Sequence, residues 1–192
     1  KSQRKPAADD PGVVAVVGFT ANAVQVFRRG QMIPLAAEDP IFRGDRVITG
    51  HGGRVRSNFN SGPQSNETFA NAHIGPDSEF VVEPLQQRLE AGAEQRTIEH
   101  IRGAVRVIVN PILRSGQIFS IRAGTTVCGI RGTEVLIEYD DQTGTARHWL
   151  LNGDADLSLG SVTRTLKPMS VVETPRQGPV QERPFSAFEY DT

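Results

Sequence analysis

The sequence predicts an all-β protein, and two observations lead to that prediction. Glycine and proline are frequent, with 19 and 12 copies among 192 residues. Together they make up about 16% of this chain, against roughly 12% of an average protein. Several segments also alternate between apolar and polar residues, which is the period of a strand with one face on a core and one in water. We therefore expect many short strands joined by turns.

The first half of the chain begins with an arm and continues with strands. Residues 1–11 are polar and charged, with a proline near either end, and predict an extended N-terminal arm. Strand-like runs then follow at close spacing, over Val13–Val17, Ala23–Phe27, Arg46–Thr49, Arg54–Phe59 and Ser78–Glu83. Only Pro84–Glu94 has helical character, and Gly92 limits it to a turn or two.

The second half alternates more regularly. Val105, Val107 and Val109 share one predicted face, and the same spacing recurs in Val135, Ile137 and Tyr139 and in Ala155, Leu157 and Leu159. Strands at this spacing, with no helix between them, predict an antiparallel sandwich, a barrel or a stacked β-coil. The chain has no exact internal repeat, so a regular solenoid is not predicted.

The chain therefore divides into a β-domain at residues 12–174 and two arms. Residues 175–192 differ from the domain because Pro175, Pro179 and Pro184 remove ladder donors and favour an extended backbone. This Pro-rich C-terminal arm also carries apolar side chains that a disordered tail does not need, namely Phe185, Phe188 and Tyr190.

Charge and processing signals narrow the partners and the compartment. The 21 Lys and Arg nearly balance the 22 Asp and Glu, for a net charge of -1. This balance argues against nucleic acid as a partner, because binding its backbone needs a surplus of cations on one face. The chain begins with Lys rather than Met, as expected of a periplasmic or extracellular protein after removal of its signal peptide, although a trimmed chain would look the same. No apolar run approaches the roughly 18 residues of a membrane span.

The sequence also lacks the common patterns of catalytic and metal sites. The four histidines, His51, His73, His100 and His148, are dispersed and form no metal-ligand pair with a neighbouring Cys or acid. Cys128 is the single cysteine, and we expect it to be an inert buried thiol. No nucleophile elbow, phosphate loop or dinucleotide fingerprint is present. We therefore predict no enzyme activity, no metal and no cofactor.

Four motifs in a fixed order carry a family resemblance. They are Gly44-Asp45-Arg46-Val47-Ile48-Thr49-Gly50, Gly75-Pro76-Asp77-Ser78, Gly103-Ala104-Val105-Arg106 and, most specifically, Ile130-Arg131-Gly132-Thr133 before an alternating strand. With these motifs, residues from about 12 to 173 resemble the FecR domain family. The resemblance implies an all-β extracytoplasmic domain, a sandwich or stacked β-coil, without a known catalytic centre. Residues 60–73 depart from the family pattern, which makes that loop a candidate for a feature particular to this protein.

Five motif residues are expected to be structural. Gly44 allows a tight entry to a strand, and the Asp45 carboxylate can accept hydrogen bonds from turn amides. Gly132 allows a bulge or a close backbone approach beside Thr133. Arg131 could then connect neighbouring turns through backbone carbonyls or a carboxylate.

Three functions of different classes follow. The first is a self-assembling structural subunit, such as a filament or surface unit, in which β-strand addition joins copies of the chain. In that hypothesis the inserted strand is either the segment with Val13, Val14 and Val16 or the segment with Phe185, Phe188 and Tyr190.

The second function is the one that the family resemblance implies. Founding FecR members are transmembrane regulators that handle a sigma factor in the cytoplasm and place the β-domain in the periplasm. This chain would then be a periplasmic sensor or regulatory domain with a cell-envelope protein as partner. A cell-wall carbohydrate binder is the third function, and it is disfavoured because Trp149 and two tyrosines make a thin platform for sugar stacking.

Overall fold

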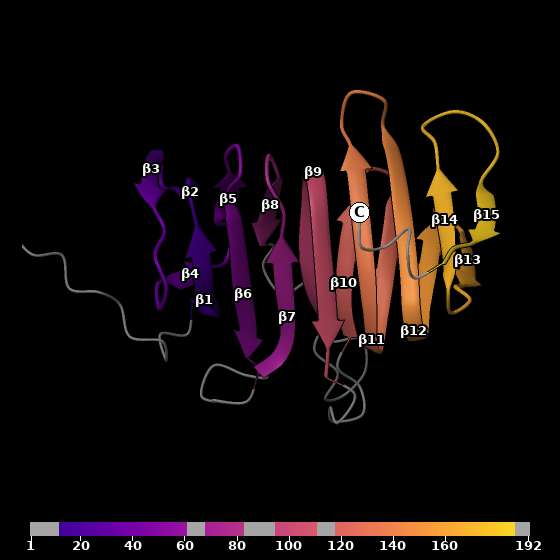
Figure 1. Cartoon of the computed structure of the whole chain (residues 1–192), viewed down its shortest axis with the longest axis horizontal. Helices are drawn as coiled ribbons and strands as arrows, with labels where there is room; N and C mark the ends of the chain where they lie inside the picture. Colours follow the sequence, from indigo (N-terminus) through magenta and orange to yellow (C-terminus); the bar gives the residue numbers. More distant parts are fainter. Residues whose placement is uncertain (1–11, 61–67, 83–94, 111–117, 187–192) are drawn as a thin grey trace, which may run out of the picture.

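The computed structural model describes residues 12–60, 68–82, 95–110 and 118–186, and every regular element in them is a β-strand. The all-β prediction is therefore confirmed. The predicted N-terminal arm, the helical stretch at 84–94, and Phe188 and Tyr190 lie outside the described residues. The strands run side by side across the long axis of the molecule, from indigo at one end to yellow at the other (Figure 1).

All strands hydrogen-bond into one 15-stranded sheet that folds over into two layers. The first layer is antiparallel throughout. Its order is β4 (Pro40–Phe42), β1 (Val13–Ala21), β6 (Arg54–Asn60), β7 (Thr68–Ile74), the second half of β9 (Gln95–Val109), the second half of β11 (Thr126–Asp140), the first half of β12 (Thr145–Leu159), β14 (Ser170–Thr174) and β15 (Gln181–Pro184).

The second layer uses the remaining halves of the three long strands. Its order is β3 (Gln31–Pro34), β2 (Val24–Arg28), β5 (Arg46–Thr49), β8 (Glu79–Val82), the first half of β9, β10 (Ile118–Ala123), the first half of β11, the second half of β12 and β13 (Val162–Thr165). The pairing of β9 with β10 is parallel and the others are antiparallel.

Three glycines mark the bends at which the long strands pass from one layer to the other. Gly103 in β9, Gly132 in β11 and Gly153 in β12 have φ angles of 88°, 63° and 73°, a region that residues with a Cβ rarely enter. The register of β11 and β12 shifts at the same point, between Arg131 and Glu134. Each long strand therefore contributes to both layers.

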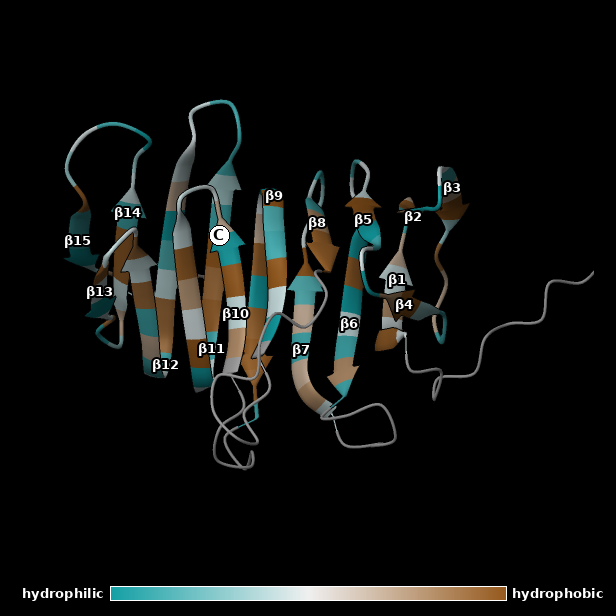
Figure 2. Cartoon of the chain, turned by 180° about the vertical axis from the view of Figure 1, so that it is seen from behind, coloured by the Kyte–Doolittle hydropathy of each residue, from teal (hydrophilic) through white to brown (hydrophobic). Residues whose placement is uncertain are grey.

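The core lies between the two layers. Apolar and polar bands alternate along the strands (Figure 2), and the apolar residues are the buried ones. Val105, Val107 and Val109 face this core, as the alternation predicts, and so do Val135 and Ile137. Because the buried side chains of both layers form one cluster, the described residues share a single core.

The C-terminal segment continues the first layer. β15 pairs antiparallel with β14, from Ser170 opposite Pro184 to Glu173 opposite Gln181. The described part of residues 175–192 therefore includes a strand of the chain's own sheet. The sequence pattern does not predict this strand, because its four residues are all exposed and show no alternation.

Candidate functional site

A row of outward-facing side chains crosses five strands of the first layer. Phe19 of β1 lies opposite Arg56 of β6, which in turn lies opposite His73 of β7. The row continues to Arg106 of β9 and Leu136 of β11. The sequence neighbours of these residues on β6, β7 and β9 point into the core. The row therefore belongs to the solvent face of the sheet.

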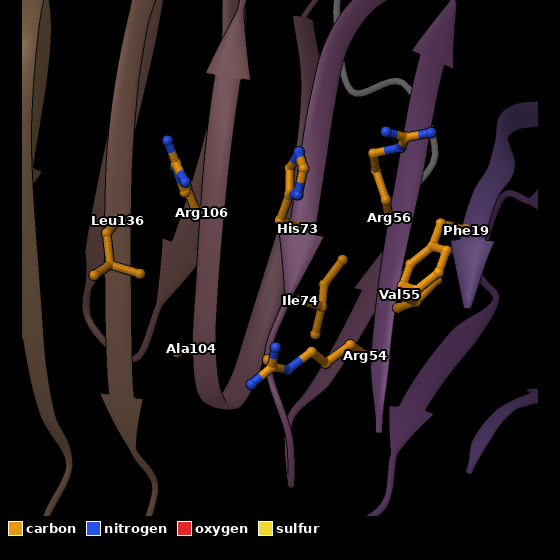
Figure 3. A pocket seen from close by; sticks show the side chains of 10 residues that line it. Phe19, Arg54, Val55, Arg56, His73, Ile74, Ala104, Arg106 and Leu136 are labelled. Carbon is orange, nitrogen blue, oxygen red and sulfur yellow. The ribbon is translucent and has the colours of Figure 1, made fainter. Parts of the chain in front are cut away.

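This row lines a pocket of about 400 Å³. Arg54, two residues before Arg56, adds a third arginine, and Ile74 and Ala104 complete the base near the bend of β9. Figure 3 shows Arg56, His73 and Arg106 side by side on neighbouring strands, with Phe19 and Leu136 at opposite ends. We call this site the cationic pocket; its charged and titratable members are Arg54, Arg56, His73 and Arg106.

The electrostatics of the cationic pocket are uneven. Arg106 forms an ion pair with Glu134 at 2.5 Å. Arg54 and Arg56 have no ion-pair partner within the part of the chain that the structure describes, and both are exposed. Burial lowers the pKa of His73 below its usual 6.5, and the charges of Arg106 and Arg56 lower it further against the opposing effect of Glu134. The lowered pKa keeps the His73 imidazole neutral at pH 7. The net positive charge of the pocket therefore comes from its arginines.

The same row continues toward the C-terminal end, where it is covered. Trp149 lies opposite Leu136 and donates a hydrogen bond from Nε1 to Glu138 at 3.2 Å. The Phe185 ring packs edge-on against the Trp149 indole, with 5.2 Å between the ring centroids. The Arg183 guanidinium lies 5.8 Å from the centroid of the Trp149 ring. The indole face of Trp149 is thus occupied by groups of the same chain.

Four of the predicted interaction residues lie in the described part of the chain, and all four pack against other parts of the same chain. Val13 and Val14 are buried and Val16 is half-buried, in a strand that pairs with β4 on one side and β6 on the other. Phe185 is also buried, against Trp149. Their role in contacts between copies stays a prediction.

The predicted motif residues lie at turns and bends. Asp45 accepts a hydrogen bond from the Phe42 amide at 2.7 Å and binds the Arg28 guanidinium through both carboxylate oxygens. Gly44 has a φ of 77°. This buried carboxylate ties the β4–β5 turn to the second layer.

The Arg131–Thr133 motif forms the bend of β11. The Arg131 guanidinium lies 3.7 Å from the Asp156 carboxylate and remains mostly exposed. Thr133 is buried, and its hydroxyl donates to the Asn152 side-chain oxygen at 3.3 Å, across to the bend of β12. Gly132 provides the positive φ between them.

Other chemistry is sparse in the described ranges. They contain no group of three or more His, Cys, Asp or Glu that could hold a metal ion. Burial, and secondarily the charge of Asp156, raises the pKa of the Cys128 thiol to about 12. The same ranges contain no helix long and apolar enough to cross a membrane.

Sequence reasoning missed the cationic pocket. Arg54 and Arg56 do occupy polar positions of a predicted strand, and Arg106 lies between two core valines. That alternation identifies them as outward-facing, but only the register of three strands, β6, β7 and β9, brings them together with His73.

The fold and the pocket define a two-layered β-domain with a cationic pocket on one face. The family model described as FecR protein matches residues 45–156, which includes β6, β7, β9 and β11. The chain therefore belongs to the FecR family, as the sequence motifs indicate. No curated protein matches the chain.

Two crystal structures share the fold. Both are of a "putative anti-sigma factor" from Parabacteroides distasonis ATCC 8503, at 2.50 and 1.65 Å resolution. Each superposes with a TM-score of 0.59 and 12% sequence identity, over 76% of this chain. The aligned region spans 62% of the length of that protein, so the likeness concerns the fold.

Proposed function

We propose that this chain is a non-catalytic regulatory domain of FecR type that acts outside the cytoplasm by binding another protein of the cell envelope. The family match over residues 45–156 carries the proposal. The fold of the Parabacteroides protein, whose description names an anti-sigma factor, supports the same direction. The periplasmic sensor is therefore favoured over the filament subunit that the terminal segments suggested.

The structure supplies a surface suited to that function. The arginines of the cationic pocket lie on β6 and β9 in the family-matched region, and they are presented by paired strands rather than by loops. Side chains on rigid strands keep their spacing, which favours selective binding.

The test is a transcript comparison in the source organism. Removing the coding region for residues 45–156 is expected to change the abundance of a restricted set of transcripts, because a regulatory domain acts through gene expression. Unchanged transcripts together with the loss of a surface structure in electron micrographs would contradict the proposal and favour the structural subunit.

One observation keeps self-assembly as a second candidate. The edge strands β3 and β13 each pair with a single neighbour, and they expose Met32 and Val162 to 46% and 57%. An open edge with apolar side chains can add a strand from another copy. Sedimentation of the purified chain at rising concentration tests this, and a constant monomer mass would exclude it.

A further inference from the structure

We infer that the cationic pocket binds an acidic, extended protein segment that carries an apolar residue beside its carboxylates. This inference rests on the proposed function, because it specifies the chemistry of the partner at that site. Three features of the pocket lead to it: its charge, the spacing of its arginines and its apolar ends.

The charge of the pocket is a local property and not a consequence of composition. The whole chain has a net charge of -1, yet three arginines line this one pocket. Glu134 neutralises Arg106 in part, while Arg54 and Arg56 have no ion-pair partner among the described residues. A surface that concentrates unpaired cations on a near-neutral chain attracts an anionic group.

The spacing of the arginines suits carboxylates along an extended backbone. Arg56 and Arg106 flank His73 on adjacent strands, and paired strands lie about 4.8 Å apart. Arg54 and Arg56 are two positions apart on one strand, which is about 6.6 Å. Alternate side chains of an extended peptide have that same separation, so acidic residues at alternate positions can each meet a guanidinium.

The ends of the pocket add an apolar requirement. Phe19 is 51% exposed although it lies in the part of β1 that pairs with β6, and Leu136 closes the other end. An exposed phenylalanine on a rigid strand is a common anchor for a partner side chain. A purely anionic polymer would leave this part of the surface unused, whereas a peptide with an aromatic or aliphatic residue would cover it.

The experiment selects ligands from a library instead of assuming one. Phage that display random 12-residue peptides are selected on the native chain, and the enriched peptides are measured by fluorescence anisotropy at low and high salt. We expect enrichment of Asp and Glu with a neighbouring aromatic or aliphatic residue, and binding that weakens as salt rises.

Two double variants with the same change in charge locate the binding surface. Arg54→Ser with Arg56→Ser should weaken the selected peptides by about tenfold. Arg43→Ser with Arg176→Ser removes two exposed arginines away from the pocket and should leave binding unchanged. Phe19→Ala should weaken peptides that carry the aromatic residue.

The outcomes separate this inference from the proposed function. Enriched peptides without an acidic excess, or equal binding by both double variants, would overturn the inference. So would tight binding of heparin with no enriched peptide, which would indicate an anionic polysaccharide. If transcripts respond to loss of the domain but not to the Arg54 and Arg56 substitutions, the regulatory proposal stands and the assignment of this face fails.

Discussion

His73 reports the electrostatics of the cationic pocket at the scale of a single residue. Burial and the charges of Arg106 and Arg56 lower its pKa, since a charged imidazole would stand beside two guanidinium groups. We expect a pKa below 6.5 by NMR titration of the native chain. Replacement of Arg56 by Ser removes one opposing charge and should raise that pKa toward 6.5.

The control for this titration is Arg43→Ser. Arg43 is an exposed arginine that directly follows β4 and does not line the cationic pocket. The effect of Arg43→Ser on the His73 titration should be negligible, because salt largely screens the interaction between exposed charges that are more than about 10 Å apart. An identical shift in both variants would mean that net charge, and not the geometry of the pocket, sets the His73 pKa.

Two further histidines, His100 and His148, are buried in the core. His100 Nε2 donates to the Gly103 carbonyl at 2.9 Å, and His148 Nε2 donates to the Thr126 hydroxyl at 3.0 Å. Among the described residues, neither ring has a hydrogen-bond partner for its Nδ1 atom. Burial lowers the pKa of His100 to about 4 and, together with the charge of His100, lowers that of His148 to about 3.

These histidines make stability depend on pH. The unfolded chain takes up protons near pH 6.5, whereas the folded chain keeps both rings neutral down to about pH 4 and about pH 3. The free energy of unfolding should therefore fall as the pH falls below 6.5, by up to about 1.4 kcal/mol per pH unit for each histidine. Urea unfolding at about pH 7 and about pH 5 measures this slope. His148→Gln should reduce the slope, and an unchanged slope would contradict the assignment.

At the scale of the element, the bends depend on glycine for two separate reasons. Gly103 has a positive φ, and a Cβ added there would lie 2.1 Å from the Ser78 hydroxyl and 2.7 Å from the Ser78 Cα. That hydroxyl accepts a hydrogen bond from the Ala104 amide at 3.0 Å and so holds the bend of β9 against β8. The bend therefore requires both the backbone conformation and the absence of a side chain.

Substitution of two glycines separates these effects. Gly30 has a φ of 80°, and a Cβ there would meet nothing within 4 Å. We expect Gly30→Ala to cost about 1 kcal/mol from backbone strain alone. Gly103→Ala should cost about 3 kcal/mol, because overpacking against Ser78 adds to that strain. Urea denaturation measures both, and equal losses would show that the contact with Ser78 relaxes freely.

The sequence predicts the strands better than it predicts their pairing. Alternation alone identifies Val105, Val107 and Val109 as core residues, because the period of a strand is a local property. It does not show that Gly103 divides β9 between two layers, since that depends on what each half meets. The row of Arg56, His73 and Arg106 is likewise set by register between distant segments. β15 escapes detection because an exposed edge strand needs no apolar alternation.

At the scale of the whole molecule, the three shared strands join the two layers covalently and through one core. β9, β11 and β12 each run through both layers. Loss of either layer would expose the inward side chains of the other, such as Ile121 of the second layer and Val107 of the first. At about 25 cal/mol per Å² of exposed apolar surface, separate unfolding of one layer is strongly disfavoured.

We therefore expect the two layers to unfold in a single transition. Trp149 is the sole tryptophan of the chain and belongs to the first layer, so its fluorescence reports that layer. A second variant, Trp149→Phe with Phe27→Trp, moves the reporter to β2 of the second layer, at a position that is 42% exposed. In each protein, urea transitions followed by fluorescence and by far-UV circular dichroism should coincide. A fluorescence midpoint that departs from circular dichroism in either protein would show that the glycine bends act as hinges between independently stable layers.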